Sequence, residues 1–379
     1  MTAASTMTKI DIPLVDLRAQ YRTIKGEVRT AIDEVLEGMQ LTIGPNVRAF
    51  DQEFADFLGA KHAVGVGSGT DALQLAIRAL GISPGDEVIT VSHTFFATVE
   101  AILYSGARPI LVDVDEKTFL MDRAMAEAAI TPRTKAIMPV HLYGRTVDMK
   151  PLLELGRDRG IPIIEDACQS HGAMLDLPDH FAGTAGVVGC FSFYCSKNLG
   201  AYGEAGSIVT NDEKLATELR SLREHGQLTR YYHPVVGYNA RLDEIQAAVL
   251  RIKLRRLHAW NERRVTLARR YNELLAGVVT TPEIPSGGRH VFHCYVVRVP
   301  AGRRDAFRDH LASRGIGTGI HYPVPVHLQE AAEFLGYRHG DLPVTERLAD
   351  EVVSLPMYPE LTDAQVESVA KATKEFFSS

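Results

Sequence analysis

The middle of the chain, residues 87–225, alternates between two kinds of segment. Short apolar runs are typical of buried strands, and the stretches between several of them have helical periodicity. The strand-like runs cover 87–91, 108–114, 135–140, 161–166, 189–194 and 207–211, and the helical stretches cover 96–105, 121–129, 148–159 and 212–225. This alternation predicts an α/β fold with a mostly parallel sheet between helices. Catalytic and binding residues are then expected at the carboxyl ends of the strands.

The flanking segments add further elements. Helices are expected over 15–39, 47–58 and 70–81, one long helix or two end to end over 241–276, a strand over 290–299, and helices over 303–314 and 362–377. The expected apolar face of the first helix consists of Ile24, Val28, Ala31, Ile32, Val35, Leu36 and Met39. Because 379 residues exceed one ordinary core, we expect a large domain at 1–250 and a smaller α+β domain at 251–379.

Charge, hydropathy and cysteine content indicate which partners and which cellular compartment to expect. The net charge of −6 arises from 41 Lys and Arg against 47 Asp and Glu, so no global basic field favours nucleic acid or membrane lipid. No apolar run approaches the roughly 18 residues of a membrane helix, and the N-terminus lacks the apolar region of a secretory signal. The four cysteines form no Cys-x-x-Cys pair, which favours reduced thiols in a cytoplasm.

The first candidate site is the turn Gly67-Ser68-Gly69-Thr70, which enters a helix. Glycines allow close backbone approach, and the positive end of a helix dipole suits a phosphate. A dinucleotide fold is a rival interpretation, but the third glycine of G-x-G-x-x-G would fall at Thr70. Taken alone, the turn is more simply explained as a helix N-cap.

Two further strand ends carry ionisable residues. Asp166 ends an apolar strand, where a carboxylate needs a partner. A protonated pyridine nitrogen would serve, and a helix cap or local salt bridge would serve equally well. Lys197 follows another apolar strand and precedes a glycine-rich loop. A lysine near apolar walls can lose its proton and act as a nucleophile, although most lysines after strands are surface residues.

Taken together, six motifs in order resemble the DegT/DnrJ/StrS family of pyridoxal-phosphate (PLP) sugar aminotransferases. They are SGTDAL (68–73), SHTFFAT (92–98), VHLYG (140–144), EDACQSHGA (165–173), FSFYCSKNLGAYGEAG (191–206) and GYNARLDEIQAAVL (237–250). The resemblance covers nearly the whole chain. It implies the PLP-dependent transferase fold of type I, that of aspartate aminotransferase, and PLP as cofactor.

The resemblance also implies roles for individual residues. Lys197 matches the Schiff-base lysine and proton shuttle, and Asp166 matches the carboxylate that pairs with the pyridine nitrogen. The other matches are Gln169 near the phenolic oxygen, Phe95 against the ring face, and Gly69, Thr70 and Ser192 at the phosphate. Asn239 resembles a residue that reaches the phosphate from the neighbouring subunit, which implies a homodimer with shared active sites. Arg241, His321 and Tyr322 are candidates for substrate contact.

The implied reaction is ping-pong transamination from L-glutamate to a nucleoside-diphosphate keto-sugar. The chain most resembles the branch acting on 3-keto-6-deoxy sugars, and a 4-keto sugar is the alternative within the class. A PLP-binding sugar dehydratase on this fold would replace the lysine with histidine, which Lys197 contradicts. A non-catalytic PLP-bound regulator is a further alternative. We expect no metal site, because no Cys/His cluster is present.

The remaining polar motifs favour structural roles. Two prolines make His321–His327 a rigid loop, and its histidines lack the spacing of an i, i+4 metal pair. Glu165 and Asp166 are neighbours on a strand, so their side chains should point to opposite faces and not form an acid/base pair. His141 and Tyr143 follow a strand and are interpreted as structural.

Overall fold

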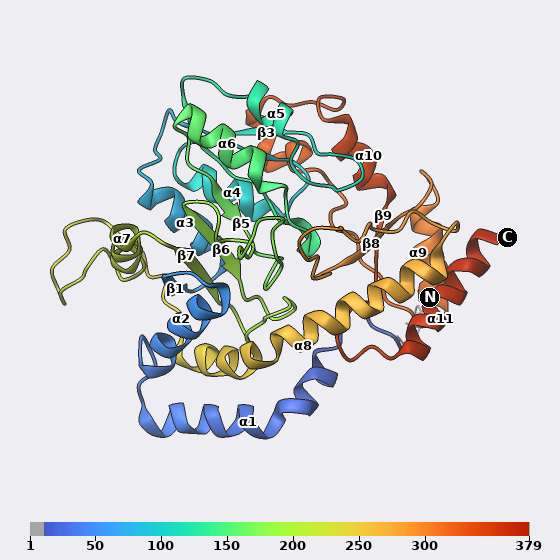
Figure 1. Ribbon diagram of the computed structural model, residues 1–379, viewed down its shortest axis with the longest axis horizontal. Helices are drawn as coiled ribbons and strands as arrows, with labels where there is room; N and C mark the ends of the chain where they lie inside the picture. The colour runs from blue at the N-terminus through green and yellow to red at the C-terminus, as the bar shows by residue number, and fades with distance from the viewer. Residues whose placement is uncertain (1–10, 379) are drawn as a thin grey trace, which may run out of the picture.

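The computed structural model describes residues 11–378, and its large sheet has the predicted alternation (Figure 1). The strands are β1 (His62–Val66), β2 (Glu87–Val91), β3 (Arg108–Val112), β4 (Thr134–Ile137), β5 (Ile164–Asp166), β6 (Val188–Ser192) and β7 (Gly206–Thr210). Their orders are β1-β7-β6-β5 and β3-β2-β4, and parallel bridges from β4 and the residues after it to β5 join the two groups. Only β7 pairs antiparallel with its neighbours, so the mostly parallel sheet is confirmed.

Helices cover both faces of this sheet because alternate strand residues face opposite sides. One face packs against α3 (Gly69–Ala79), α7 (Glu213–Arg223) and part of α4 (Phe96–Tyr104). The other packs against α2 (Pro45–Leu58), α5 (Arg123–Ala128), α6 (Met149–Arg159) and the start of α8. In β6, for example, Phe191 joins the second core and Cys190 joins the first. Within residues 11–378, no helix has the length and apolar character that crossing a bilayer requires.

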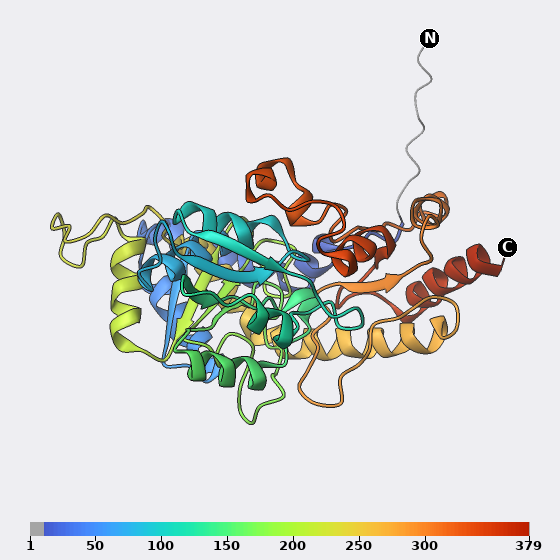
Figure 2. The same ribbon diagram turned by 90° about the horizontal axis from the view of Figure 1, so that it is seen from above.

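A single long helix, α8 (Glu244–Leu275), runs from the side of the large sheet to the C-terminal end of the chain (Figure 1 and Figure 2). Its contacts are with α1 (Leu17–Gly38) and α2 at one end and with α11 (Asp363–Ser378) at the other. A separate core surrounds its last turns, the antiparallel pair β8 (Tyr295–Arg298) and β9 (Val352–Leu355), and α9 (Arg304–Ser313). The helix therefore runs across the predicted boundary at residue 250, which stays a prediction.

Several local expectations were wrong. The strand expected over 290–299 begins only at Tyr295, because Phe292 has a left-handed φ of 45° and Val291 N–H donates to Gly144 O. In α1 (Leu17–Gly38), Ile24, Val28 and Val35 are buried, but Leu36 is 41% exposed because the helix packs along one stripe only; Met39 follows the helix with a left-handed φ of 49° and is 70% exposed. The helix α10 (Pro343–Glu351) and strand β9 were not predicted.

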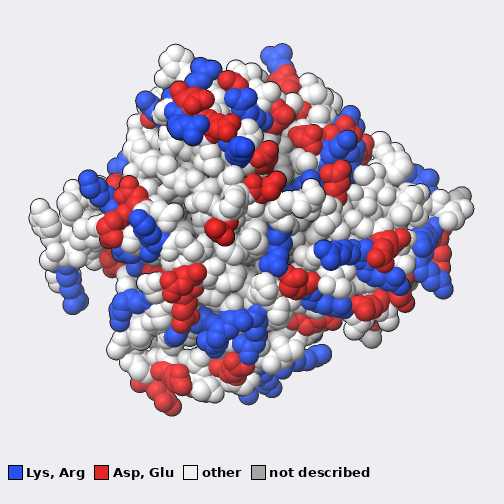
Figure 3. All heavy atoms as spheres, viewed as in Figure 1, with Lys and Arg blue, Asp and Glu red and all other residues white. Residues whose placement is uncertain are grey.

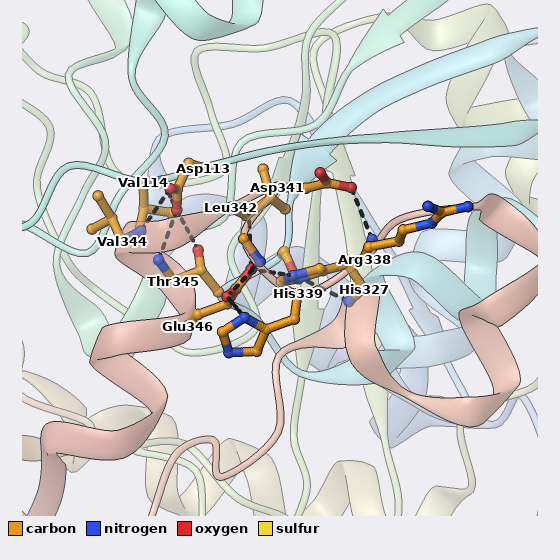
Figure 4. Close-up of polar contacts among 12 residues, drawn as sticks. Asp113, Val114, His327, Arg338, His339, Asp341, Leu342, Val344, Thr345 and Glu346 are labelled. Carbon is orange, nitrogen blue, oxygen red and sulfur yellow. Dashed lines mark hydrogen bonds and ion pairs between the residues drawn. The ribbon is translucent and has the colours of Figure 1, made fainter.

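Two buried acidic residues, Asp113 and Glu346, hold the segment before β9 against the large sheet (Figure 4). Asp113, just after β3, accepts hydrogen bonds from the backbone N–H groups of Val344 and Thr345 at the start of α10. Glu346 accepts from His327 Nε2 at 3.0 Å and from Gly340 N–H. Burial opposes ionisation, but these hydrogen bonds outweigh it and lower the pKa of Glu346.

His327 continues this network to the end of β2. Its backbone N–H donates to Ser92 Oγ over 3.1 Å, and its Nδ1 lies 2.7 Å from the same hydroxyl. Ser92 opens the loop that leads through Phe95 into α4. The 326–346 segment is thus held against the loop that carries Phe95.

The surface seen in Figure 3 has Lys and Arg side chains intermixed with Asp and Glu side chains. Charged side chains of the chain form many ion pairs, such as Arg251 with Glu53 at 2.7 Å and Arg263 with Asp363 at 2.8 Å. The face in view therefore has no extended region of a single charge.

Candidate active site

A cavity of about 610 Å³ lies at the carboxyl ends of the strands. Nine of the eleven residues singled out in the sequence line it: Gly69, Thr70, Phe95, Asp166, Gln169, Ser192, Lys197, His321 and Tyr322. They come from the ends of several strands, the start of α3 and the loop at 321–322. The fold thus brings together groups that are up to 253 positions apart (69 to 322) in the sequence.

One end of the cavity is suited to an anion. The helix α3 begins at Gly69, and the Ser68 side chain caps it by accepting from Asp71 N–H at 3.0 Å. A Cβ atom on Gly69 would lie 2.5 Å from the Ser192 Cβ, so only glycine allows this approach. The helix start, the Thr70 hydroxyl and Ser192 therefore share one wall, as a phosphate site requires.

Another wall carries a buried carboxylate that forms no ion pair within the described residues. Asp166 is 4% exposed, and its Oδ2 accepts from Thr98 Oγ1 at 2.8 Å while Oδ1 accepts from Cys168 N–H at 3.2 Å. In the described part of the chain, no Lys, Arg or His forms an ion pair with Asp166. The local salt bridge left open by the sequence is therefore not what holds this carboxylate. A cationic group on a ligand is the partner that this wall can accept.

Lys197 lies in the turn after β6, where its backbone N–H donates to Tyr194 O at 2.8 Å. Burial lowers the pKa of its ammonium group, and the acidic groups Cys168, Cys294 and Asp166 partly oppose that effect. The neutral amine is a nucleophile and a base, so this environment suits both Schiff-base chemistry and proton transfer.

A further part of the cavity wall is organised around Gln169, which is buried. Its Oε1 accepts from the Tyr143 backbone N–H at 2.7 Å, and its Nε2 donates to the Tyr322 hydroxyl at 3.0 Å. The Phe95 ring, 56% exposed, lies 5.7 Å from the Tyr322 ring. The position of Phe95 leaves its ring available to stack on a planar ligand.

The loop at 321–322 also brings His321 to the cavity. Its Nδ1 lies 2.7 Å from Ser354 Oγ on β9. Burial and the charge of Lys197 lower its pKa to about 4, so the ring is neutral near pH 7. His321 can therefore exchange hydrogen bonds with a substrate without carrying charge.

Two predicted residues are not in the cavity. Asn239 is exposed, and its backbone bridges to that of Glu224. Arg241 pairs with Glu224, with 2.9 Å between Nη1 and Oε1. Neither side chain is among those lining the cavity.

Other lining residues were missed in the sequence: Thr94, Thr98, Tyr194, Glu204 and His293. Thr94, Thr98, Tyr194 and Glu204 belong to motifs that were quoted, and only the folded geometry shows that their side chains reach the cavity. Glu165, in contrast, points away and accepts from buried His141 at 2.8 Å and from the N–H groups of Gly183 and Ala185.

Comparisons with known proteins agree with this geometry. The model of the DegT/DnrJ/EryC1/StrS aminotransferase family matches residues 22–374. The UDP-N-acetyl-3-dehydro-alpha-D-glucosamine 3-aminotransferase of Acidithiobacillus ferrooxidans is 46% identical over 360 residues, which are 95% of this chain and 96% of that protein. The dTDP-3-amino-3,4,6-trideoxy-alpha-D-glucose transaminase of Streptomyces venezuelae is 45% identical over 371 residues, 96% of each chain.

A solved structure extends the likeness to three dimensions. The crystal structure of DesV from S. venezuelae, in complex with a ketimine intermediate, is 45% identical and has a TM-score of 0.95. The match covers 98% of this chain and 100% of the DesV chain.

The fold and site define a PLP-dependent sugar aminotransferase. The chain belongs to the DegT/DnrJ/EryC1/StrS aminotransferase family. Its own residues fit PLP, because an anion site, a buried carboxylate outside the ion pairs of the described residues and a lysine with lowered pKa line one cavity. Gly69, Thr70 and Ser192 would hold the phosphate, and Asp166 the protonated ring nitrogen.

Proposed function

We propose that this enzyme moves an amino group from L-glutamate to the ketone at carbon 3 of a nucleoside-diphosphate 6-deoxy sugar. The observation that carries the proposal is the placement of Asp166, buried and without an ion-pair partner in the described part of the chain, in the same cavity as Lys197. The position of the ketone is supported by the names of the two relatives, which both place the amino group at carbon 3.

The residues divide the work by chemistry. When bound, PLP carries the amino group and withdraws electrons from the substrate carbon. Asp166 keeps the ring nitrogen protonated, and Phe95 holds the ring by stacking. Burial favours the neutral form of Lys197, which would move a proton between the two reacting carbons, one on the substrate and one on the cofactor.

The substrate is held by residues of the loop at 321–322. His321 and Tyr322 line the cavity, and both carry groups that can exchange hydrogen bonds with sugar hydroxyls. Arg241 lies outside the cavity of its own protomer, where it pairs with Glu224. We assign it to the substrate of a partner's site.

The enzyme works as a homodimer with shared active sites. Asn239 is exposed at the base of a projecting loop, 226–238, that carries the exposed side chains of Tyr231, Tyr232 and Val236. Such side chains are typical of interfaces, and Asn239 then reaches the phosphate of the partner's site. The four free cysteines, all reduced, fit a cytoplasmic enzyme.

Absorption and activity test the roles of Lys197 and Asp166. The holoenzyme should be yellow, and L-glutamate should bleach its visible band. Lys197→Ala should lose the band of the lysine linkage and all transamination, whereas the exposed Lys214→Ala control should keep both. A Lys197→Ala protein that still transaminates would contradict the mechanism.

Substrate position is tested with a panel of 3-keto and 4-keto nucleotide sugars. Turnover of the 3-keto compound with kcat/KM at least about 100-fold higher is expected. Preference for the 4-keto compound would overturn the assignment of carbon 3. Inactivity on both, with bleaching by glutamate intact, would overturn the sugar class that we propose.

Mixing two defective variants tests the shared site. Lys197→Ala and Asn239→Ala each damage one half of a site, but a mixed dimer contains one complete site. Random reassociation of equal amounts should restore about a quarter of wild-type activity, since half of the dimers are mixed and each has one of two sites intact. Absence of any recovery would contradict the shared site.

A further inference from the structure

The strongest unexplained contact in the cavity wall is between two threonines and Asp166. Thr98 Oγ1 lies 2.8 Å from Asp166 Oδ2, and Thr94 Oγ1 lies 2.8 Å from Thr98 Oγ1. Both threonines are buried, with Thr98 1% and Thr94 3% exposed, and both line the cavity. We propose that Thr98, backed by Thr94, is a positioning residue that aims the Asp166 carboxylate at the ring nitrogen of the cofactor. The proposal rests on the function assigned above.

The direction of the two bonds follows from the chemistry of the groups. An ionised carboxylate can only accept, so the Thr98 hydroxyl donates its hydrogen to Asp166. That hydroxyl has no second hydrogen, and the Thr94 hydroxyl must therefore donate to it. The chain Thr94–Thr98–Asp166 thus delivers one charge-assisted bond whose donor is itself polarised by a second hydroxyl.

Threonines make two kinds of hydrogen bond in the helices of this chain. A threonine hydroxyl inside a helix usually bonds back to the carbonyl four residues earlier. Three threonines of this chain do so: Thr217 to Glu213 O, Thr266 to Glu262 O and Thr373 to Val369 O. Thr98, in the first turn of α4, instead donates to Asp166, 68 positions away, just as Thr345 in the first turn of α10 donates to buried Asp113.

The partners of Asp166 explain why the bond matters. Oδ1 accepts the Cys168 N–H at 3.2 Å, and Oδ2 accepts from Thr98 at 2.8 Å. Together they fix the rotation of the carboxylate from two sides. Without Thr98, only Cys168 is left to hold the side chain, and its orientation toward the ring nitrogen is no longer set from two sides.

The same short segment also carries Phe95. Residues 94–98 therefore hold both the ring-stacking residue and the donor to Asp166, and Ser92 anchors the segment to His327. A shift at Thr98 would move the carboxylate and the aromatic ring in relation to each other. This coupling makes Thr98 part of the cofactor site without its touching the reacting atoms.

The test compares the holoenzymes of Thr98→Val, Thr98→Ser, Thr94→Val and Asp166→Asn. Thr98→Val keeps the shape but removes the donor, and loss of a charge-assisted bond should lower kcat about 10- to 100-fold. The pH midpoint of the visible cofactor band should also move upward, because a weaker hold on the protonated ring nitrogen leaves the lysine linkage more basic. A purely structural threonine would not move that midpoint. Thr98→Ser should restore both, and Thr94→Val should shift both in the same direction by less.

The Asp166→Asn enzyme distinguishes the assignment of Asp166 from the positioning role of Thr98. If Asp166→Asn keeps full activity, the assignment of Asp166 itself is wrong. If Asp166→Asn is inactive but Thr98→Val has the wild-type kcat and pH midpoint, the role of Thr98 is overturned while the proposed function stands. Should Thr98→Val fail to fold, Thr98→Ala takes its place and the same two readouts decide.

Discussion

Gln169 donates a hydrogen bond from Nε2 to the Tyr322 hydroxyl over 3.0 Å and accepts one at Oε1 from Tyr143 N–H. The bond joins a residue just after β5 to a loop 153 positions later. Both groups line the cavity. The orientation of the Gln169 amide therefore depends on the loop at 321–322, the same loop that we assign to the substrate.

Tyr322→Phe should expose this dependence. The change removes one hydroxyl and leaves the Gln169 Nε2 without its partner, which should lower kcat/KM for the keto-sugar about 10-fold. Single-turnover measurements of each half-reaction check where the loss falls. Tyr104→Phe, on an exposed tyrosine of α4, is the matched control and should leave both half-reactions unchanged. Wild-type kinetics in Tyr322→Phe would show that the contact does not matter.

Local sequence could predict much of this site because its residues follow apolar strands. Asp166 and Lys197 lie at or just after β5 and β6, where apolar runs end in polar residues. The part played by Thr98 could not be predicted, because its partner lies 68 positions away and only folding brings them together. The contact that holds the start of α10 could not be predicted either, because Asp113, which accepts from the Val344 N–H, lies 231 positions earlier in the chain.

Glu165→Gln should destabilise the protein strongly. The fully buried Glu165 accepts from His141, Gly183, Ala185 and Gly186, and a glutamine would turn an NH₂ group toward some of these donors. Breaking such a network should cost about 3 kcal/mol of unfolding free energy. Urea unfolding checks this, with the exposed Glu218→Gln as a control that should change by less than about 0.5 kcal/mol. Equal midpoints for the two variants would contradict the role of Glu165.

Glu346→Ala should loosen the cofactor site from outside the cavity. It leaves His327 Nε2 and the N–H groups of Gly340 and Leu342 without their acceptor, at a cost of about 2–4 kcal/mol. Because His327 also bonds to Ser92, the loop that carries Phe95 should release the cofactor faster. Dialysis followed by absorption measures the release. The exposed Glu330→Ala is the control, and equal rates for both variants would exclude this coupling.

Acidification should destabilise the enzyme partly through His93. Burial lowers the pKa of His93 to about 4, although the charge of Asp113 raises it. The unfolded chain, with a pKa near 6.5, therefore takes up a proton that the folded chain does not, and stability is lost as pH falls from about 6.5 to 4. Within that window one such group contributes about 1.4 kcal/mol per pH unit.

His93→Gln tests this assignment because glutamine can still donate to the Tyr143 hydroxyl, which His93 Nε2 contacts at 2.9 Å. Urea unfolding of the holoenzyme between pH 6 and 4.5 should give a slope smaller than that of the wild type by about 1.4 kcal/mol per pH unit. The exposed His180→Gln variant should keep the wild-type slope. If His93→Gln also keeps it, His93 takes up its proton equally in the folded and unfolded chains, and burial does not lower its pKa.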